Sequence, residues 1–378
     1  MRIAVLSETE GAETRVAATP ETVKKYKGLG ADVAVQAGAG AKAGFPDAEF
    51  EAAGAVIAPS REDALRDSDI VLKVRRPAEG ELAGAKPGAL VVAIMDPYGQ
   101  DAALKSLAEA GVAAFAMELM PRITRAQVMD VLSSQANLAG YRAVIDASGE
   151  YGRAIPMMMT AAGTVPAARV FVMGAGVAGL QAIATARRLG AVVTATDVRP
   201  AAKEQVESLG AKFIAVEDEE FRQAETAGGY AKEMSAEYRE KQAALVASHI
   251  AKQDIVITTA LIPGRPAPTL VTRAMVESMK PGSVIVDLAV ERGGNCELSR
   301  PGEIATHNGV KIVGHLNVPG RLAATASSLY AKNLYAFVET LVDKESKVLS
   351  VKWDDELVKA TCLTRGGAVV HPAFQPAA

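Results

Sequence analysis

Short apolar runs alternate with amphipathic stretches along the first third of the chain. Runs typical of buried strands cover residues 3–6, 32–36, 55–58, 70–74, 89–95 and 113–117. Helical periodicity lies between them, for example over residues 20–29 and 101–110. Because strands that alternate with helices build parallel sheets with helices on both faces, this pattern predicts an α/β domain.

The pattern changes after Arg122. Residues 123–153 predict one or two long helices that lead to a second domain. On these helices the polar residues Gln127, Asp130 and Ser134 have i, i+3, i+7 spacing and would share one face, beside Arg122 and Arg125. This face could simply be solvated, or it could bind a ligand at the predicted domain junction. Apolar residues would face a core: Val128, Val131, Leu132 and Leu138.

Alternation resumes beyond residue 169, with strands predicted over 170–173, 191–196, 213–216, 254–260, 283–288 and 311–314. The charged stretch between residues 217 and 252 is too long for an ordinary connection and predicts a helix and a mobile loop around 218–234. A final helix over 323–341 would return to the first domain. We therefore expect two Rossmann-like domains, residues 1–133 with 322–378 and residues 134–321, each with a mostly parallel, doubly wound sheet, joined by long helices with a cleft between them.

The segment from Arg169 to Arg199 combines strand, glycine turn, helix, strand and acid. The sequence GAGVAG starting at Gly174 follows an apolar strand and opens a helix, the context that a dinucleotide-binding motif requires. Gly174 permits the tight turn, Gly176 lets the backbone approach a pyrophosphate, and Gly179 lets the helix pack against the strand. Asp197 follows at the distance of an acid that binds the ribose 2′-hydroxyl and repels a 2′-phosphate, which predicts NAD rather than NADP.

The composition of the chain argues against several classes of function. The chain of 378 residues is 49% hydrophobic and 22% charged, as in ordinary globular proteins. A net charge of −3 without a basic cluster argues against nucleic acid as a partner. The only cysteines, Cys296 and Cys362, lie far apart, which indicates a reducing compartment. No apolar run reaches the length of a membrane-spanning helix, so any membrane association would go through a partner.

Other candidate sites are weaker. The four histidines are scattered, so no metal site is expected, and His315 is the best placed because it follows a predicted strand. A second glycine motif begins at Gly38, but no helix opens after it to receive a phosphate. Arg15 and Lys73 follow predicted strands and could hold an α-keto acid, or could be solvated surface residues.

Several longer segments resemble the NAD(H)-binding domain of proton-translocating nicotinamide nucleotide transhydrogenase. They include MELMPRITRAQVMDVLSSQANLAGYRAVIDA, the glycine-motif segment, AETAGGYAKEM, TTALIPGRPAPTLVT and MKPGSVIVDLAVERGGNC. The similarity extends over nearly the whole chain, which looks like the separate α subunit of the bacterial three-subunit form.

The resemblance implies a homodimer that passes hydride directly between its own NAD(H) and NADP(H) on a partner subunit. Membrane-spanning subunits would couple this transfer to proton translocation and hold the chain on the inner face of the cytoplasmic membrane. It also implies that Tyr230 belongs to a mobile loop over the nucleotide. Arg122, Gln127, Asp130 and Ser133 would position the nicotinamide. The predicted cofactor-binding residues also include Gly174, Ala175, Gly176, Val177, Gly179, Asp197, Val198 and Arg199.

Two alternatives accompany this interpretation. Alanine dehydrogenase has the same fold and shares the Arg15 and Lys73 positions, but it uses a histidine near position 96, where this chain has Asp96. A module that senses NAD(H) without chemistry would show the same glycine motif. The chain also departs from the transhydrogenase pattern at Leu316 and in the Asp96-Pro97 segment.

Overall fold

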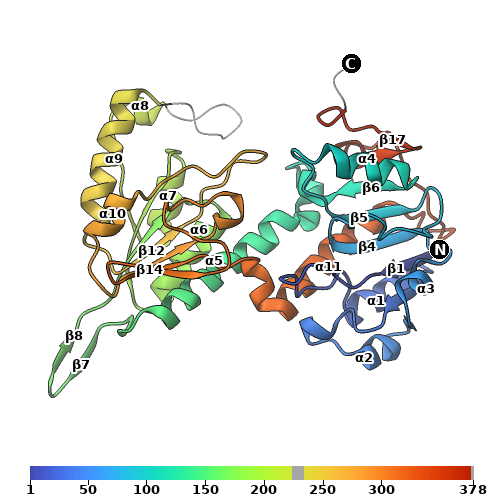
Figure 1. The fold of residues 1–378 in the computed structure, drawn as a ribbon, viewed down its shortest axis with the longest axis horizontal. Helices are drawn as coiled ribbons and strands as arrows, with labels where there is room; N and C mark the ends of the chain where they lie inside the picture. Colours follow the sequence, from blue (N-terminus) through green and yellow to red (C-terminus); the bar gives the residue numbers. More distant parts are fainter. Residues whose placement is uncertain (224–233, 376–378) are drawn as a thin grey trace. The chain divides into compact units, whose positions relative to one another are not determined.

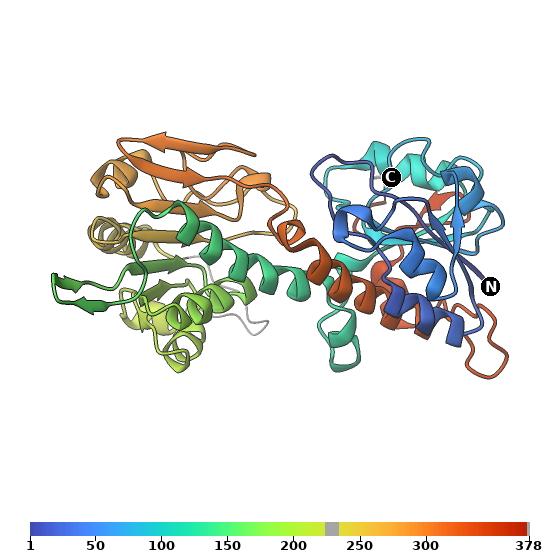
Figure 2. The same ribbon diagram turned by 90° about the horizontal axis from the view of Figure 1, so that it is seen from below.

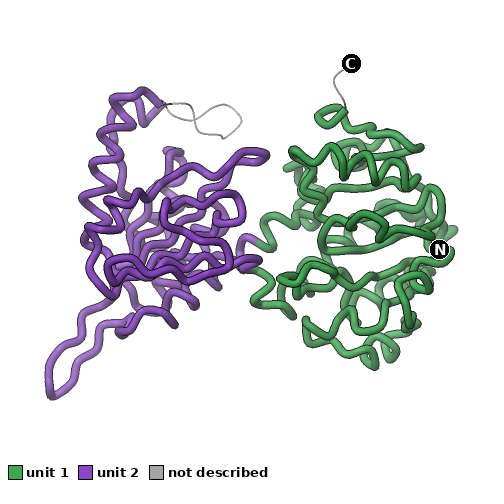
Figure 3. Tube along the Cα trace, viewed as in Figure 1, with its two compact units in different colours: residues 1–135, 319–378 green, residues 136–318 purple. Residues whose placement is uncertain are grey.

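The chain folds into two units, each with its own sheet and core (Figure 3). One unit contains residues 1–135 and 319–378, and the other contains residues 136–318. The structure is a computed structural model, in which residues 1–223 and 234–375 are described. The second unit is therefore an insertion into the first.

The first unit is built on a parallel sheet with the order β3-β2-β1-β4-β5-β6 (Figure 1). Its strands are β1 (Arg2–Val5), β2 (Asp32–Gln36), β3 (Val56–Ala58), β4 (Ile70–Arg75), β5 (Leu90–Ile94) and β6 (Ala113–Ala116). The strand order reverses between β1 and β4, and the central strands are buried on both faces.

Helices cover both faces of this sheet. One face packs against α1 (Pro20–Gly28) and α11 (Ala323–Thr340), and the other against α3 (Arg61–Leu65) and α4 (Asp101–Glu109). The remaining elements are α2 (Asp47–Ala52), α12 (Glu356–Thr361) and a short hairpin of β16 (Thr364–Arg365) and β17 (Ala368–Val369). Tyr330, Leu334 and Phe337 of α11 are fully buried, so the end of the chain completes the core of the first unit.

The second unit has a sheet with the order β11-β10-β9-β12-β13-β15-β14 in its described residues. Only β14 runs antiparallel to its neighbour. The strands are β9 (Arg169–Met173), β10 (Val192–Thr196), β11 (Lys212–Phe213), β12 (Ile255–Thr258), β13 (Val284–Asp287), β14 (Ile304–His307) and β15 (Val310–Val313). With the first sheet, this arrangement confirms the predicted α/β class with mostly parallel, doubly wound sheets.

The second unit has a core on each face of its sheet, and successive side chains of β9 point to opposite faces. Val170 and Val172 pack with α5 (Val131–Glu150), α6 (Val177–Arg188) and α7 (Ala202–Ser208), and Phe171 packs with α9 (Ala236–Ile250) and α10 (Arg273–Ser278). The short helix α8 (Glu219–Arg222) precedes the segment that is not described. Among the described residues, no helix combines the length and apolar character needed to cross a bilayer.

A hairpin of β7 (Met158–Thr160) and β8 (Gly163–Val165) projects from the second unit (Figure 2). No strand was predicted at this hairpin, because its residues lie in the apolar run before the glycine motif. The side chain of Met159 is 79% exposed.

The long helices predicted over residues 123–153 are wrong in their first third. A 3₁₀ helix, η3 (Thr124–Met129), ends at Asp130, whose extended ψ of 92° breaks the helix before α5 begins. This break shifts the helical phase, so Gln127, Asp130 and Ser134 do not share one helix face. Val128 is 65% exposed and Leu132 is 50% exposed, against the prediction that both face a core.

Candidate functional site

The glycine turn after β9 lies at the point where the strand order of the second sheet reverses. Strand β9 pairs with β10 on one side and β12 on the other, and the chain leaves it through Gly174 to Gly176 into α6. Ligands of doubly wound sheets bind at such a point, beyond the carboxyl ends of the strands.

The three glycines of the motif, Gly174, Gly176 and Gly179, differ in the atoms that a side chain would contact. Gly174 has a φ of 105°, and a Cβ there would lie 2.4 Å from Oγ1 of Thr259. A Cβ on Gly179 would lie 1.8 Å from the carbonyl oxygen of Gly174, so the close approach of helix and strand needs a bare backbone. A Cβ on Gly176 would meet no atom within 4 Å. The space above Gly176 is therefore open to a ligand.

The start of α6 is suited to an anion. Gly176 is its N-cap residue and makes no side-chain bond to the first-turn N–H groups, which remain available as donors. The residues present thus fit the pyrophosphate of a dinucleotide.

Asp197 lies directly beside this turn. Its Oδ2 accepts a hydrogen bond of 2.7 Å from the Ala175 N–H, and its Oδ1 accepts one of 2.9 Å from the Arg199 N–H. The Arg199 guanidinium also pairs with the carboxylate, at 3.0 Å from Oδ1. The structure therefore brings the glycine turn and the predicted acid together. Val198, between Asp197 and Arg199 in the sequence, is exposed.

Helix α5 supports α6 from behind. A Cβ on Gly140 would lie 2.0 Å from the carbonyl oxygen of Ala178, so the two helices cross in backbone contact. Nδ2 of Asn137 donates to Oε1 of Gln181 at 3.3 Å beside this crossing. Gly140 was missed by sequence reasoning, because no local pattern marks it.

The residues predicted to position the nicotinamide lie in the first unit, around the break between η3 and α5. Arg122 and Gln127 are exposed, and Gln127 lies within η3. Asp130 and Ser133 are brought together: Asp130 accepts from the Ser133 N–H at 2.9 Å and from its hydroxyl at 2.5 Å. The Asp130 carboxylate thus caps the first turn of α5. Tyr230 lies outside the described residues.

Asn333 of α11 was also missed. Its Nδ2 donates to the Val128 carbonyl at 2.8 Å, and its Oδ1 accepts from the Ser134 hydroxyl at 2.7 Å. It therefore holds residues on both sides of the break at Asp130.

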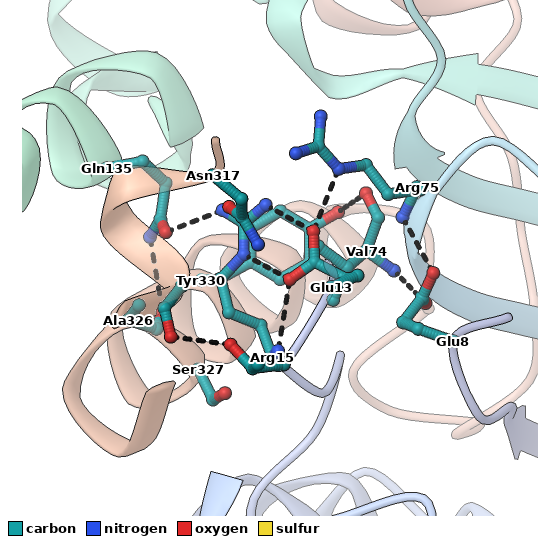
Figure 4. A network of polar contacts seen from close by, with 12 residues as sticks. Glu8, Glu13, Arg15, Val74, Arg75, Gln135, Asn317, Ala326, Ser327 and Tyr330 are labelled. Carbon is teal, nitrogen blue, oxygen red and sulfur yellow. Dashed lines mark hydrogen bonds and ion pairs between the residues drawn. The ribbon is translucent and has the colours of Figure 1, made fainter. Parts of the chain in front are cut away.

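Arg15 and Lys73 are not solvated surface residues, one of the two interpretations above. They are 4% and 1% exposed, and each pairs with a carboxylate of its own unit. Arg15 binds both oxygens of Glu13 at 2.7 and 2.8 Å, and Arg75 binds the same carboxylate at 2.8 Å (Figure 4). Lys73 lies within β4 rather than after it.

The fixed charges around Glu13 determine its protonation. Burial by itself would raise the pKa of Glu13, but the hydrogen bonds and charge of Arg15 and the charge of Arg75 outweigh it and lower this pKa to about 2. Burial dominates at Glu8 and Glu118 instead and raises the pKa of both carboxyls.

The lowered pKa of Glu13 predicts that this residue contributes to the stability of the fold and that acid removes the contribution. Its pKa is below the ordinary value of 4.5, so the ionised Glu13 stabilises the fold above pH 4.5, by on the order of 3 kcal/mol. The contribution is lost as the pH falls from 4.5 towards 2. The stability advantage of wild type over Glu13→Gln, measured by urea unfolding, should shrink between pH 5 and pH 3. Because Glu8 and Glu118 are common to both proteins, an advantage that stays constant would contradict this assignment.

The remaining candidates are the second glycine motif, the two cysteines and a metal site. The Gly38 segment leads only to a 3₁₀ turn, η1 (Ala41–Ala43), and no α-helix opens there, as expected. Both cysteines are free and buried. In the described part of the chain, no group of three or more His, Cys, Asp or Glu side chains is arranged to hold a metal ion.

Comparison with known proteins assigns the chain to a family. The family described as "Alanine dehydrogenase/PNT, C-terminal domain" matches residues 143–372, and the corresponding N-terminal domain matches residues 4–139. The chain belongs to the alanine dehydrogenase/PNT family. The predicted resemblance is therefore confirmed.

Relatives within the alanine dehydrogenase/PNT family include both enzyme types. The chain is 60% identical to an NAD(P) transhydrogenase subunit alpha protein of Rhodospirillum rubrum, over 99% of each chain. A solved transhydrogenase structure from Sinorhizobium meliloti is 64% identical, with a TM-score of 0.90 over 98% of this chain and 100% of that one. "Alanine dehydrogenase" of Halomonas elongata is 33% identical, over 91% of this chain and 88% of that one. The chain is thus nearly twice as identical to the two transhydrogenase proteins as to the alanine dehydrogenase.

Proposed function

We propose that this chain is the NAD(H)-binding subunit of a proton-translocating transhydrogenase. In this role it exchanges hydride directly between its own NAD(H) and NADP(H) on a partner subunit. Membrane-spanning subunits couple the exchange to proton translocation and hold the chain on the inner face of the cytoplasmic membrane. The observation that carries the proposal is the open backbone at Gly176 beside Asp197, in a chain 60% and 64% identical to two transhydrogenase proteins.

The proposed roles of the residues follow from their chemistry. The backbone at Gly176 and Val177 receives the pyrophosphate, and Asp197 binds the ribose hydroxyls. Arg122, Gln127, Asp130 and Ser133 orient the nicotinamide end, and Tyr230, outside the described residues, also contacts the nucleotide. The nicotinamide cofactors themselves supply and accept the hydride, so the protein needs to align them and exclude water rather than transfer a proton.

The proposed homodimer has support in the β7–β8 hairpin. A two-stranded hairpin is marginally stable alone in water, and this one exposes Met157, Met158 and Met159. A second copy of the chain that covers these side chains would remove this exposure. Sedimentation of the purified chain tests the assignment, and a monomer at micromolar concentration would contradict it.

One experiment tests the central activity. The chain is mixed with a transhydrogenase NADP(H)-binding domain, and reduction of an NAD analogue by NADPH is followed by absorbance. A parallel sample contains NADH, pyruvate and ammonium. Activity in the first sample supports the proposal, activity in the second alone supports an alanine dehydrogenase, and NADH binding without either activity supports a sensing module. Fluorescence titration should show tighter binding of NADH than of NADPH.

Replacing Gln127 separates orientation from binding. Gln127→Ala should slow hydride transfer about tenfold or more, because orientation controls the rate of the chemical step. NADH affinity should stay within about twofold, since the backbone cradle is unchanged. Gln205→Ala, at an exposed glutamine of α7, is the matched control. Equal turnover in the two variants would show that Gln127 is an ordinary exposed residue with no role in hydride transfer.

A further inference from the structure

The segment that carries Gln127 has an unusual backbone. Helix η3 is a 3₁₀ helix of 6 residues, whereas runs longer than three or four are uncommon because their hydrogen bonds have poorer geometry. Two of its residues, Ala126 and Met129, are buried, but Gln127 and Val128 are exposed. Such a segment needs support from elsewhere in the fold to keep one conformation.

Besides the packing of Ala126 and Met129 in the core, polar contacts of different strength support the segment at two places. Arg125 pairs with Asp355 and Glu356 near the start of α12, at 3.0 and 2.9 Å, but these side chains are partly or largely exposed and such pairs contribute little. Asn333 is buried, and both ends of its amide are used. Its contacts with Val128 and Ser134 span the break at Asp130, so one side chain fixes the exit of η3 and the first turn of α5.

Removing the Asn333 amide would leave the Val128 carbonyl without this donor, and the Ser134 hydroxyl would keep only its contacts with Val131 and Gln135. Unsatisfied buried polar groups are costly, and the flanking segment can relieve the cost by moving towards water. The residues that move would be Gln127 and its neighbours up to Ser134.

We infer that Asn333 is a positioning residue for hydride transfer, because it holds the η3 segment that presents Gln127 in its working conformation. This role rests on the proposed function. Asn333 does not touch the nucleotide in this scheme, and it acts only through the segment from Val128 to Ser134.

The test combines a structural and a kinetic measurement. In Asn333→Ala, hydrogen exchange of the amides from 126 to 134 should become about tenfold faster, and hydride transfer should become about tenfold slower. NADH affinity should stay within about twofold, which a global structural defect would not produce. When Gln127 is already alanine, Asn333→Ala should slow transfer by clearly less than the roughly tenfold expected in wild type, because part of its effect passes through Gln127.

Two further variants complete the experiment. Ser328→Ala, on the exposed side of α11, is the matched control and should behave as wild type. Ser134→Ala removes one of the two contacts and should give an intermediate effect, so it carries the test if Asn333→Ala does not fold. Unchanged exchange, or faster exchange with unchanged transfer, overturns the positioning role alone. A wild-type chain without transhydrogenase activity overturns the proposed function, and the positioning role with it.

Discussion

Gly176→Ala should strongly weaken NADH binding while the fold remains intact. Gly176 has a φ of −76°, which alanine adopts without strain, and its added methyl would meet no protein atom within 4 Å. The methyl would instead fill the space through which a pyrophosphate approaches the backbone. We expect NADH affinity to fall about 100-fold or more, which corresponds to roughly 3 kcal/mol.

Fluorescence titration and thermal unfolding of the same samples check this result. Gly149→Ala is the matched control, because a Cβ at Gly149 in α5 also meets nothing within 4 Å and lies outside the glycine turn. Gly176→Ala should unfold within about 2 °C of this control. Normal NADH binding by Gly176→Ala would remove the glycine turn from the nucleotide site.

Gly179→Ala should have the opposite profile, with a large loss of stability. The added Cβ would lie 1.8 Å from the oxygen and 2.8 Å from the carbon of the Gly174 carbonyl, and backbone atoms cannot move aside as a flexible side chain can. We expect a loss of about 3 kcal/mol or more, or a melting temperature lower by roughly 10 °C.

Thermal unfolding monitored by circular dichroism measures the effect, again beside Gly149→Ala. Loss of NADH binding at a temperature where Gly179→Ala is still folded would show that the turn itself has shifted. A melting temperature equal to that of the control would mean that helix α6 separates from β9 at little cost, against the close contact described here.

The glycine turn could be predicted from sequence because its spacing is a local pattern. Gly174 has a φ of 105°, Gly179 lies against the Gly174 carbonyl five residues earlier, and Asp197 follows after one helix and one strand. The break at Asp130 could not be predicted in the same way. Apolar periodicity does not distinguish a 3₁₀ helix from an α-helix, and the cap that Asp130 forms on Ser133 interrupts the pattern.

Long-range partners account for the other differences. Lys73 is buried because Glu81 pairs with it, and Asn333 reaches a segment about 200 positions earlier in the chain. A spacing pattern carries no information on such pairs. Only Glu13, two residues before Arg15, offered a local signal that the arginine has a partner of its own.

The insertion of one unit into the other reverses the usual order of folding during synthesis. Domains normally become complete from the N-terminus onwards. Here the second unit has all of its residues once the ribosome has passed residue 318, whereas the first still lacks α11 and its buried Tyr330 and Phe337. On the nascent chain the second unit can therefore close first. The sheet of the first unit is translated earlier, but it must wait for α11 to complete the cover of one of its faces.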